Sequence, residues 1–80
     1  MRRFQIEART DEDAVCLIRE LAPYAPQVSG RSIVVELDER SASDLFALLA
    51  ALDACLRANE IPSVRVEVDG RAYLLAPQPL

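Results

Sequence analysis

The chain has 80 residues, of which 51% are hydrophobic, and nine arginines against thirteen acidic residues give it a net charge of −4 at neutral pH. This length predicts a single domain over residues 1–80, and the apolar content is high enough for the chain to fold. The absence of histidine excludes histidine-based catalysis, and the net negative charge argues against nucleic acid as a partner.

The sequence predicts neither an export signal nor a membrane span. Apolar and polar residues alternate at the N-terminus, where a signal peptide needs an unbroken apolar segment. The longest apolar run, residues 45–52, is far shorter than the ~20 residues needed to cross a bilayer. Cys16 and Cys55 have neither the spacing of a metal site nor the number of a disulfide framework. We therefore expect a cytoplasmic protein with reduced thiols, no membrane partner, no metal ion and no other cofactor.

A strand and a helix are predicted for the first part of the chain. Apolar and polar residues alternate over residues 3–9, which is the period of a strand with one exposed face. Thr10 then provides a helix N-cap. Three carboxylates follow it, and negative charge is stabilising near the positive, N-terminal end of the helix dipole. The helix is expected to end near Ala22, because Pro23 cannot continue its hydrogen bonds. Residues 23–31 are predicted to form an irregular loop.

The remaining elements are a strand, a long helix and a β-hairpin. Ser41 begins a Ser-x-x-Asp capping motif, and Ile61-Pro62 ends the helix because a residue before proline avoids the helical conformation. Asp69-Gly70 between two β-rich runs predicts a two-residue hairpin turn. The expected spans are residues 32–38, 41–59, 64–68 and 71–75.

The alternation along the strands predicts an α+β two-layer sandwich. Sheets covered by helices on both faces have strands that are continuously apolar, whereas these strands alternate. We expect the order β-α-β-α-β-β, with a four-stranded mixed sheet whose first three strands progress in one direction and both helices on one face. The alternative is three layers, with the helices on opposite faces. The open sheet face, a candidate surface for another protein, would carry Arg3, Glu7, Glu36, Arg65 and Glu67.

The long helix carries apolar residues on two sides. One side is the predicted core stripe, with Phe46 at its shoulder: Leu45, Leu48, Leu49, Leu52 and Leu56. The reverse side carries alanines where a surface helix usually has charges: Ala47, Ala51, Ala54 and Ala58. Small side chains let two helices approach closely, so the alanine strip predicts a homodimer contact bordered by Asp53 and Arg57. The alternative is that these alanines are simply exposed helix formers.

Thiols and carboxylates are the chemical candidates. Cys16 is predicted to be accessible but unreactive, because the carboxylates of the first helical turn oppose thiolate formation. Cys55 is predicted to pack as a small hydrophobic residue. Glu36 and Glu67 suggest a glycosidase-like acid pair, but a flat sheet offers no substrate cleft, so we expect charge pairs with arginines on neighbouring strands. We therefore expect no catalytic residue and no enzyme, but a protein-interaction module that homodimerises and that Ala51→Glu makes monomeric.

The segment from Ile61 to Arg71 resembles the proline-strand-Asp-Gly hairpin of glutaredoxins, whose β-α-β-α-β-β order is also similar. The resemblance implies a thiol-disulfide or glutathione-binding function, with Pro62 as the cis proline of that family. This chain has no Cys-x-x-Cys motif after its first predicted strand and lacks the final helix of the family. The resemblance therefore implies a small ligand-binding or regulatory protein without the redox motif.

The segment from Ile33 to Ile61 is similar to the STAS domains of anti-sigma-factor antagonists, in which a serine at the start of a helix is phosphorylated. Ser41 and Ser43 occupy the matching positions. Free N–H groups at a helix N-terminus can hold a phosphate. A serine at this position is also explained by helix capping alone.

Overall fold

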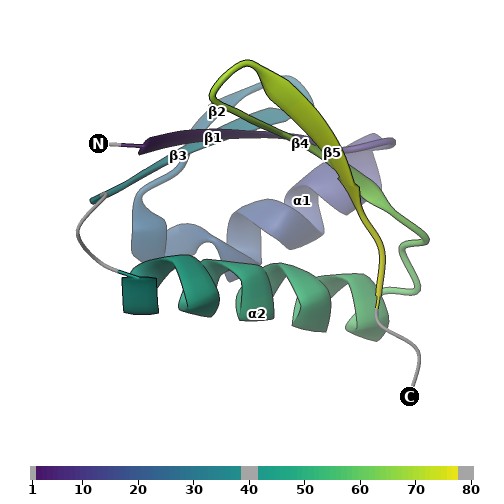
Figure 1. Cartoon of the computed structure of the whole chain (residues 1–80). Helices are drawn as coiled ribbons and strands as arrows, with labels where there is room; N and C mark the ends of the chain where they lie inside the picture. The colour runs from purple at the N-terminus through teal and green to yellow at the C-terminus, as the bar shows by residue number, and fades with distance from the viewer. Residues whose placement is uncertain (1, 39–41, 78–80) are drawn as a thin grey trace.

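The protein forms a two-layer α+β fold in which both helices lie on one face of the sheet (Figure 1). The computed structural model describes residues 2–38 and 42–77. The predicted two-layer arrangement is confirmed, and the three-layer alternative is wrong. The elements are β1 (Arg2–Glu7), α1 (Asp11–Glu20), the 3₁₀ helix η1 (Ala22–Tyr24), β2 (Gln27–Ser29), β3 (Ser32–Leu37), α2 (Ala42–Ala58), β4 (Val64–Val68) and β5 (Arg71–Leu75).

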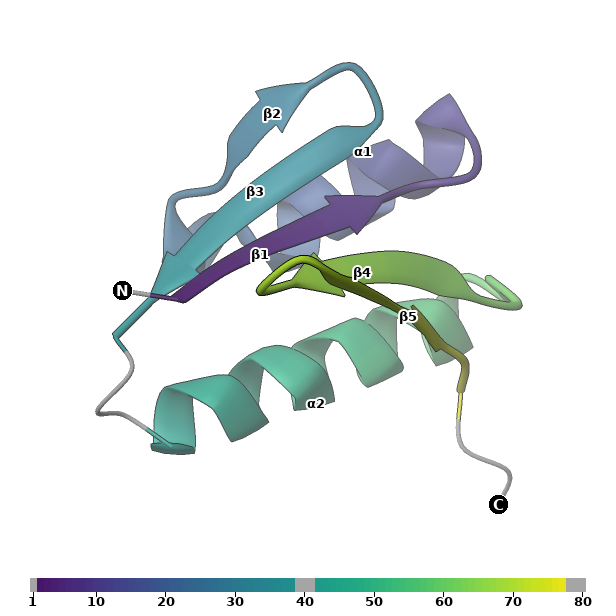
Figure 2. The same ribbon diagram turned by 45° about the horizontal axis from the view of Figure 1, so that its top comes forward.

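The sheet differs from the expected four-stranded mixed sheet. In the part of the chain that the structure describes, it has five strands in the order β2-β3-β1-β4-β5, and all neighbouring pairs are antiparallel (Figure 2). The additional strand, β2, lies in the segment predicted as a loop. A turn at Gly30 (φ +60°) and Arg31 joins β2 to β3 and reverses the chain. Consequently β3 runs antiparallel to β1. The expectation that the first three predicted strands progress in one direction across the sheet is wrong, because β1 lies between β3 and β4.

Two split β-α-β units make up most of the fold. In the first, β1, α1 and β2 leave a gap that β3 fills; in the second, β3, α2 and β4 leave a gap that β1 fills. This interlocked connectivity is that of ferredoxin-like folds. The strand β5 extends the sheet through the predicted two-residue turn, where Asp69 (φ +52°) and Gly70 (φ +79°) have the positive φ angles of a type I′ turn. Such a fold hosts many functions and assigns none.

The core lies between the sheet and the helices, as the alternation predicts. The inward residues of β1, β3 and β4 are buried, whereas their neighbours in sequence face outward. In α1, the Thr10 hydroxyl accepts a hydrogen bond of 3.1 Å from the Asp13 N–H, which confirms the predicted N-cap. The largest fully buried side chains are Ile6, Leu17, Leu21, Ile33, Leu48, Leu52, Leu56, Val35, Val64 and Cys55.

The orientation of α2 corrects part of its predicted core stripe. Leu48, Leu52 and Leu56 are buried as expected, and Leu45 is half-buried. Leu49, however, is 38% exposed, whereas Cys55 is only 1% exposed. The buried side of α2 is therefore turned toward α1, which brings Cys55 rather than Leu49 into the core. Ser41, the predicted cap of this helix, lies outside the described residues.

Candidate interaction surface

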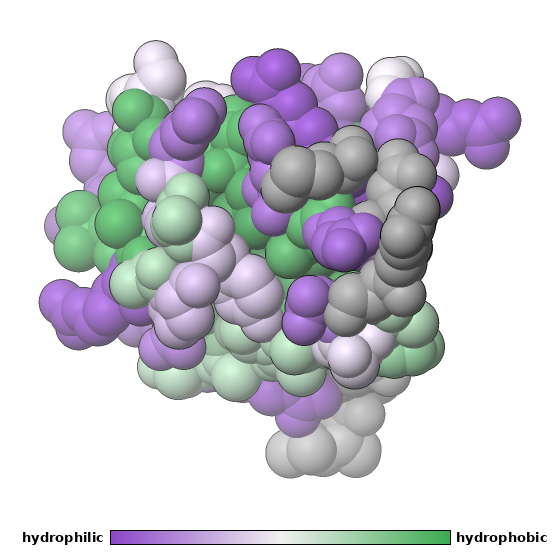
Figure 3. Space-filling view, turned by 90° about the vertical axis from the view of Figure 1, so that its left-hand side faces the viewer, coloured by the Kyte–Doolittle hydropathy of each residue, from purple (hydrophilic) through white to green (hydrophobic). Residues whose placement is uncertain are grey.

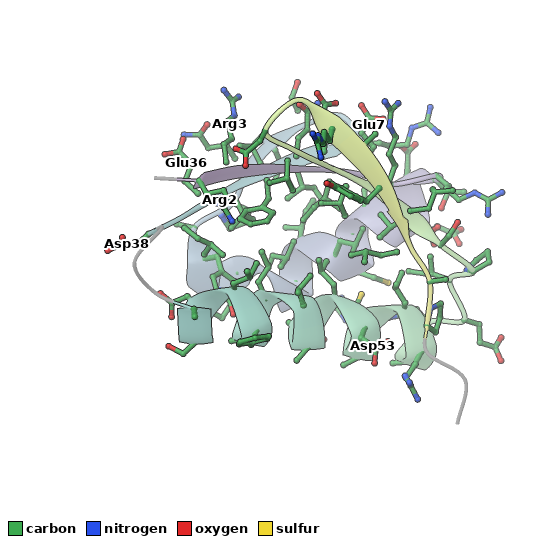
Figure 4. The ribbon with its side chains drawn as sticks, viewed as in Figure 1. Arg2, Arg3, Glu7, Glu36, Asp38 and Asp53 are labelled. Carbon is green, nitrogen blue, oxygen red and sulfur yellow. The ribbon has the colours of Figure 1, made fainter. Side chains whose placement is uncertain are left out.

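The open face of the sheet carries the charged residues predicted for it. Arg3 lies opposite Glu36 in the register of β1 and β3, and Glu7 lies opposite Arg65 in the register of β1 and β4. The Nη1 atom of Arg65 is 3.7 Å from the Oε2 atom of Glu7. In Figure 4, Arg3, Glu7 and Glu36 lie on the side of the sheet away from the helices. This face is thus organised by pairing between opposite charges across strands.

The two carboxylates considered as an acid pair are not on neighbouring strands. Glu36 lies on β3 and Glu67 lies on β4, with β1 between them. In register, Gln5 stands opposite Glu67, and its side-chain amide donates a hydrogen bond of 3.1 Å to the Ser32 hydroxyl. A shallow depression near Glu67 does not include Glu36 and is lined by Arg3, Gln5, Glu67, Asp69 and Gly70. The sheet face therefore shows no acid pair across a cleft.

The outer side of α2 is apolar and exposed. Phe46 is 69% exposed, and Ala50 and Ala54 are also exposed. At about 100° per residue, these three side chains fall within about 80° of one another, opposite the stripe of Leu48 and Leu52. We call the surface formed by Phe46, Ala47, Ala50 and Ala54 the outer α2 face.

The predicted alanine strip overlaps this face but is displaced toward α1. Ala47, Ala54 and Ala58 are exposed, whereas Ala51 is half-buried. The sequence reasoning missed Ala50 and placed Phe46 at the edge of the core. A helix that is apolar on all sides leaves one side uncovered unless a further layer packs on it. The apolar residues all around this helix could therefore have identified Phe46 and Ala50 as exposed.

Apolar surface continues from α2 to the edge strand β5. A depression of about 350 Å³ between them is lined by Leu49, Ala50, Asp53, Leu56, Leu75 and Ala76. On β5, Tyr73 is 52% exposed, whereas Leu74, which is 75% exposed, lies opposite Arg65 and faces the open side of the sheet. Figure 3 views the end of the sandwich where β1 begins; weakly hydrophobic groups cover much of the lower, helical side, and the most hydrophilic groups lie mainly toward the sheet.

The predicted polar border of the alanine strip is present on α2. The Nε atom of Arg57 donates a hydrogen bond of 2.9 Å to the Oδ2 atom of Asp53, one helical turn earlier. Both side chains are partly buried. The ion pair lies near the C-terminal end of the outer α2 face, so the charges are at its margin and the centre is apolar.

Both thiols meet at the contact between α1 and α2. The half-buried Cys16 donates a hydrogen bond of 3.3 Å to Oδ1 of Asn59, and Nδ2 of Asn59 lies 3.6 Å from the Cys55 sulfur. Burial raises the pKa of the Cys55 thiol, and the nearby Cys16 and Glu20 raise it further. The prediction that Cys55 packs in the core is confirmed, whereas Cys16 is less accessible than expected.

The structure describes some of the residues named by the family resemblances. The described residues contain no cis peptide bond, so the implied cis conformation of Pro62 is wrong. The observed order also has an additional strand compared with the β-α-β-α-β-β order on which the glutaredoxin resemblance rests. Ser43 is exposed in the first turn of α2, and Ser41 lies outside the described residues.

Comparison with known proteins adds no assignment. No protein-family model matches the chain, and no curated protein or solved structure is significantly similar to it. Within residues 2–38 and 42–77, no helix is long and apolar enough to span a membrane. The same residues contain no group of three or more cysteine, aspartate or glutamate side chains placed to hold a metal ion. The candidate functional surface is the outer α2 face, where exposed apolar residues gather.

Proposed function

We propose that this protein is a non-enzymatic, cytoplasmic interaction module that forms a homodimer through the outer α2 face. The observation that carries this proposal is an exposed apolar surface on a helix with no charged residue between Asp44 and Asp53. Phe46, a large aromatic side chain, is 69% exposed on it. Aromatic side chains at the centre of apolar surfaces contribute strongly to protein association.

A second copy of the chain fits this surface when the two α2 helices pack antiparallel. A twofold axis beside Ala50 places Phe46 of each copy opposite Ala54 of the other, four residues on either side of the axis. A large side chain then faces a small one, and the alanines allow the helix axes to approach closely. The outer α2 face is therefore complementary to itself in shape.

The charges at the ends of α2 favour the same arrangement. Asp44 lies in the first turn of α2 and Arg57 lies in its last turn. Antiparallel packing brings the acidic end of one helix toward the basic end of the other, and it also opposes the two helix dipoles. The charges at the helix ends are thus compatible with antiparallel packing.

The size of the domain also favours association. A domain of 80 residues buries a modest fraction of the surface that its unfolded chain exposes. One face of the sheet is also left without a covering layer (Figure 1). Burial of the outer α2 face in a dimer would add apolar contacts that the single chain lacks.

The test compares charged substitutions on the two helices by light scattering after size-exclusion chromatography. Ala50→Glu places two carboxylates beside the twofold axis, so we expect the dimer dissociation constant to rise at least about tenfold. Val15→Glu is the matched control, because Val15 is 55% exposed on α1, outside the proposed contact. The control variant should associate like the unmodified chain.

Circular dichroism establishes that each variant is folded before its mass is interpreted. Ala54→Glu is the second variant at the same surface and should also weaken the dimer. Its position is more informative than Ala51, which is half-buried beside α1. A monomeric unmodified chain at every concentration, or a folded Ala50→Glu variant that associates normally, would show that the proposal is wrong.

A further inference from the structure

One side-chain amide joins the two cysteines of the protein. The Asn59 amide accepts a hydrogen bond from the Cys16 thiol at Oδ1, at 3.3 Å, and approaches the Cys55 sulfur through Nδ2, at 3.6 Å. The cysteines are 39 positions apart in the sequence and lie on different helices. The packing of α1 against α2 therefore brings two thiols that are distant in the chain to the same amide.

The amide that contacts both sulfurs is in a position to move away. Asn59 directly follows the last residue of α2 and is exposed. Its Nδ2 atom donates a hydrogen bond of 2.9 Å to the Cys55 carbonyl. Hydrogen bonds at the end of a helix open more readily than those in its middle. A disulfide requires Cβ atoms roughly 3.5–4.5 Å apart. Outward rotation of Asn59 would release both sulfurs from the amide that contacts them.

We propose that Cys16 and Cys55 are a reversible oxidation site at which a hydroperoxide drives formation of an intramolecular disulfide. The site joins the middle of α1 to the C-terminal part of α2. It is separate from the outer α2 face, because Cys55 is 1% exposed and faces the core. Neither the proposed dimer nor any enzymatic activity is needed for this reaction.

The chemistry proceeds in two balanced steps. The Cys16 thiol loses its proton and the thiolate attacks one peroxide oxygen; the O–O bond breaks, and the released hydroxide takes up that proton, so the products are a sulfenic acid on Cys16 and one water. The Cys55 sulfur then attacks the Cys16 sulfur, an S–S bond replaces the S–O bond, and the hydroxide leaves with the remaining thiol proton as a second water. The two thiols are thereby oxidised by two electrons, and the peroxide is reduced to water.

The order of the two steps follows from the surroundings of each thiol. Cys16 is half-buried and can be reached by a small oxidant, whereas Cys55 is covered by the core. Burial also holds the Cys55 pKa above its usual value, so Cys55 is the poorer first nucleophile. Although the sequence predicts an unreactive Cys16, it is the more accessible of the two thiols, so we assign Cys16 as the residue that reacts with peroxide and Cys55 as the residue that resolves it.

The direct test treats the purified full-length chain with hydrogen peroxide, denatures it, and alkylates the remaining thiols with N-ethylmaleimide. Intact-mass spectrometry should show a loss of about 2 Da with no alkylation, which dithiothreitol reverses. The cross-linked chain should also unfold at a higher temperature, since the bond restricts the unfolded ensemble.

Single variants identify the reacting residue. In Cys55→Ser, peroxide should leave a sulfenic acid on Cys16 that dimedone labels, and in Cys16→Ser no oxidised thiol should accumulate over the same period. Oxidation of the unmodified chain to a sulfinic acid on Cys16, with Cys55 still alkylated, would overturn the proposal. A product linked between two chains would overturn it as well.

Discussion

The two helices pack on the same face of one sheet, yet they are covered very differently. In α1, Leu17 is fully buried and Ala14 is 4% exposed, while the outward positions include Glu12 and Arg19. In α2, the inward leucines are equally buried, but the outward positions are alanines and Phe46. The fold thus covers most of the apolar surface of α1, although Val15 is 55% exposed, and it covers that of α2 on one side alone. This difference is the basis of the proposal that α2 makes a second contact.

The largest expected effect comes from truncating a core side chain on α1, compared with an exposed side chain on α2. Leu17→Ala in α1 should lower the free energy of unfolding by about 2–5 kcal/mol, because it leaves a cavity in the core. Phe46→Ala in α2 should change the unfolding free energy by no more than about 0.5 kcal/mol in a monomer, because its side chain is largely exposed. Urea denaturation of both variants in the monomeric Ala50→Glu background measures this contrast. Equal losses of stability would show that the two helices are covered alike.

A smaller effect is expected at the start of α1. The Thr10 hydroxyl satisfies the Asp13 N–H, so Thr10→Ala should lower the unfolding free energy by about 1 kcal/mol. Thr10→Ser keeps the hydroxyl and is the matched control, which should retain most of the stability. Urea denaturation measures both variants. If alanine and serine were equally stable at this position, the cap would not contribute to holding α1.

The smallest effect is expected from pH at the contact between the helices. Burial raises the pKa of Cys55 above its ordinary value of 9.0, so the unfolded chain loses this proton at a lower pH than the folded chain. The contribution of Cys55 to stability is therefore complete below about pH 9.0 and declines above it. Urea midpoints measured on either side of that pH should fall more steeply for the unmodified chain than for Cys55→Ala. A steeper decline in Cys55→Ala would contradict the raised pKa.

The features of the fold that depend on local chemistry could be predicted from the sequence. The Thr10 cap, the alternating strands and the Asp69-Gly70 turn all follow from a few adjacent residues. The inward and outward faces of the sheet follow from the same alternation, which is why the two-layer arrangement could be predicted.

The strand β2 could not be recognised by the same reasoning. Its three residues, Gln27–Ser29, are all exposed, so they show no alternation between buried and exposed positions. The one local signal was Ser29-Gly30, which provides the positive φ angle of a tight hairpin turn. Because this strand was not predicted, the direction expected for β3 was wrong. The topology expected for the whole sheet was therefore wrong as well.

The candidate surface depended on tertiary packing. The sequence shows that α2 is apolar around its circumference, but it does not show which side the sheet and α1 cover. The contact with α1 determines that Cys55, rather than Leu49, lies in the core. The same orientation of α2 places Phe46 and Ala50 on the exposed side. The predicted alanine strip therefore overlaps the outer α2 face, but the two are not centred on the same residues.

The central claim, a dimer with its twofold axis beside Ala50, is tested most directly by site-specific cross-linking. Ala50→Cys in a Cys16→Ser, Cys55→Ser background places one thiol from each copy next to the axis, and Ala72→Cys on β5 is the control at an exposed position away from it. Under mild oxidation, we predict a covalent dimer of twice 8.9 kDa for Ala50→Cys and little for Ala72→Cys. Equal cross-linking of the two variants, or none in Ala50→Cys, would contradict the proposed contact.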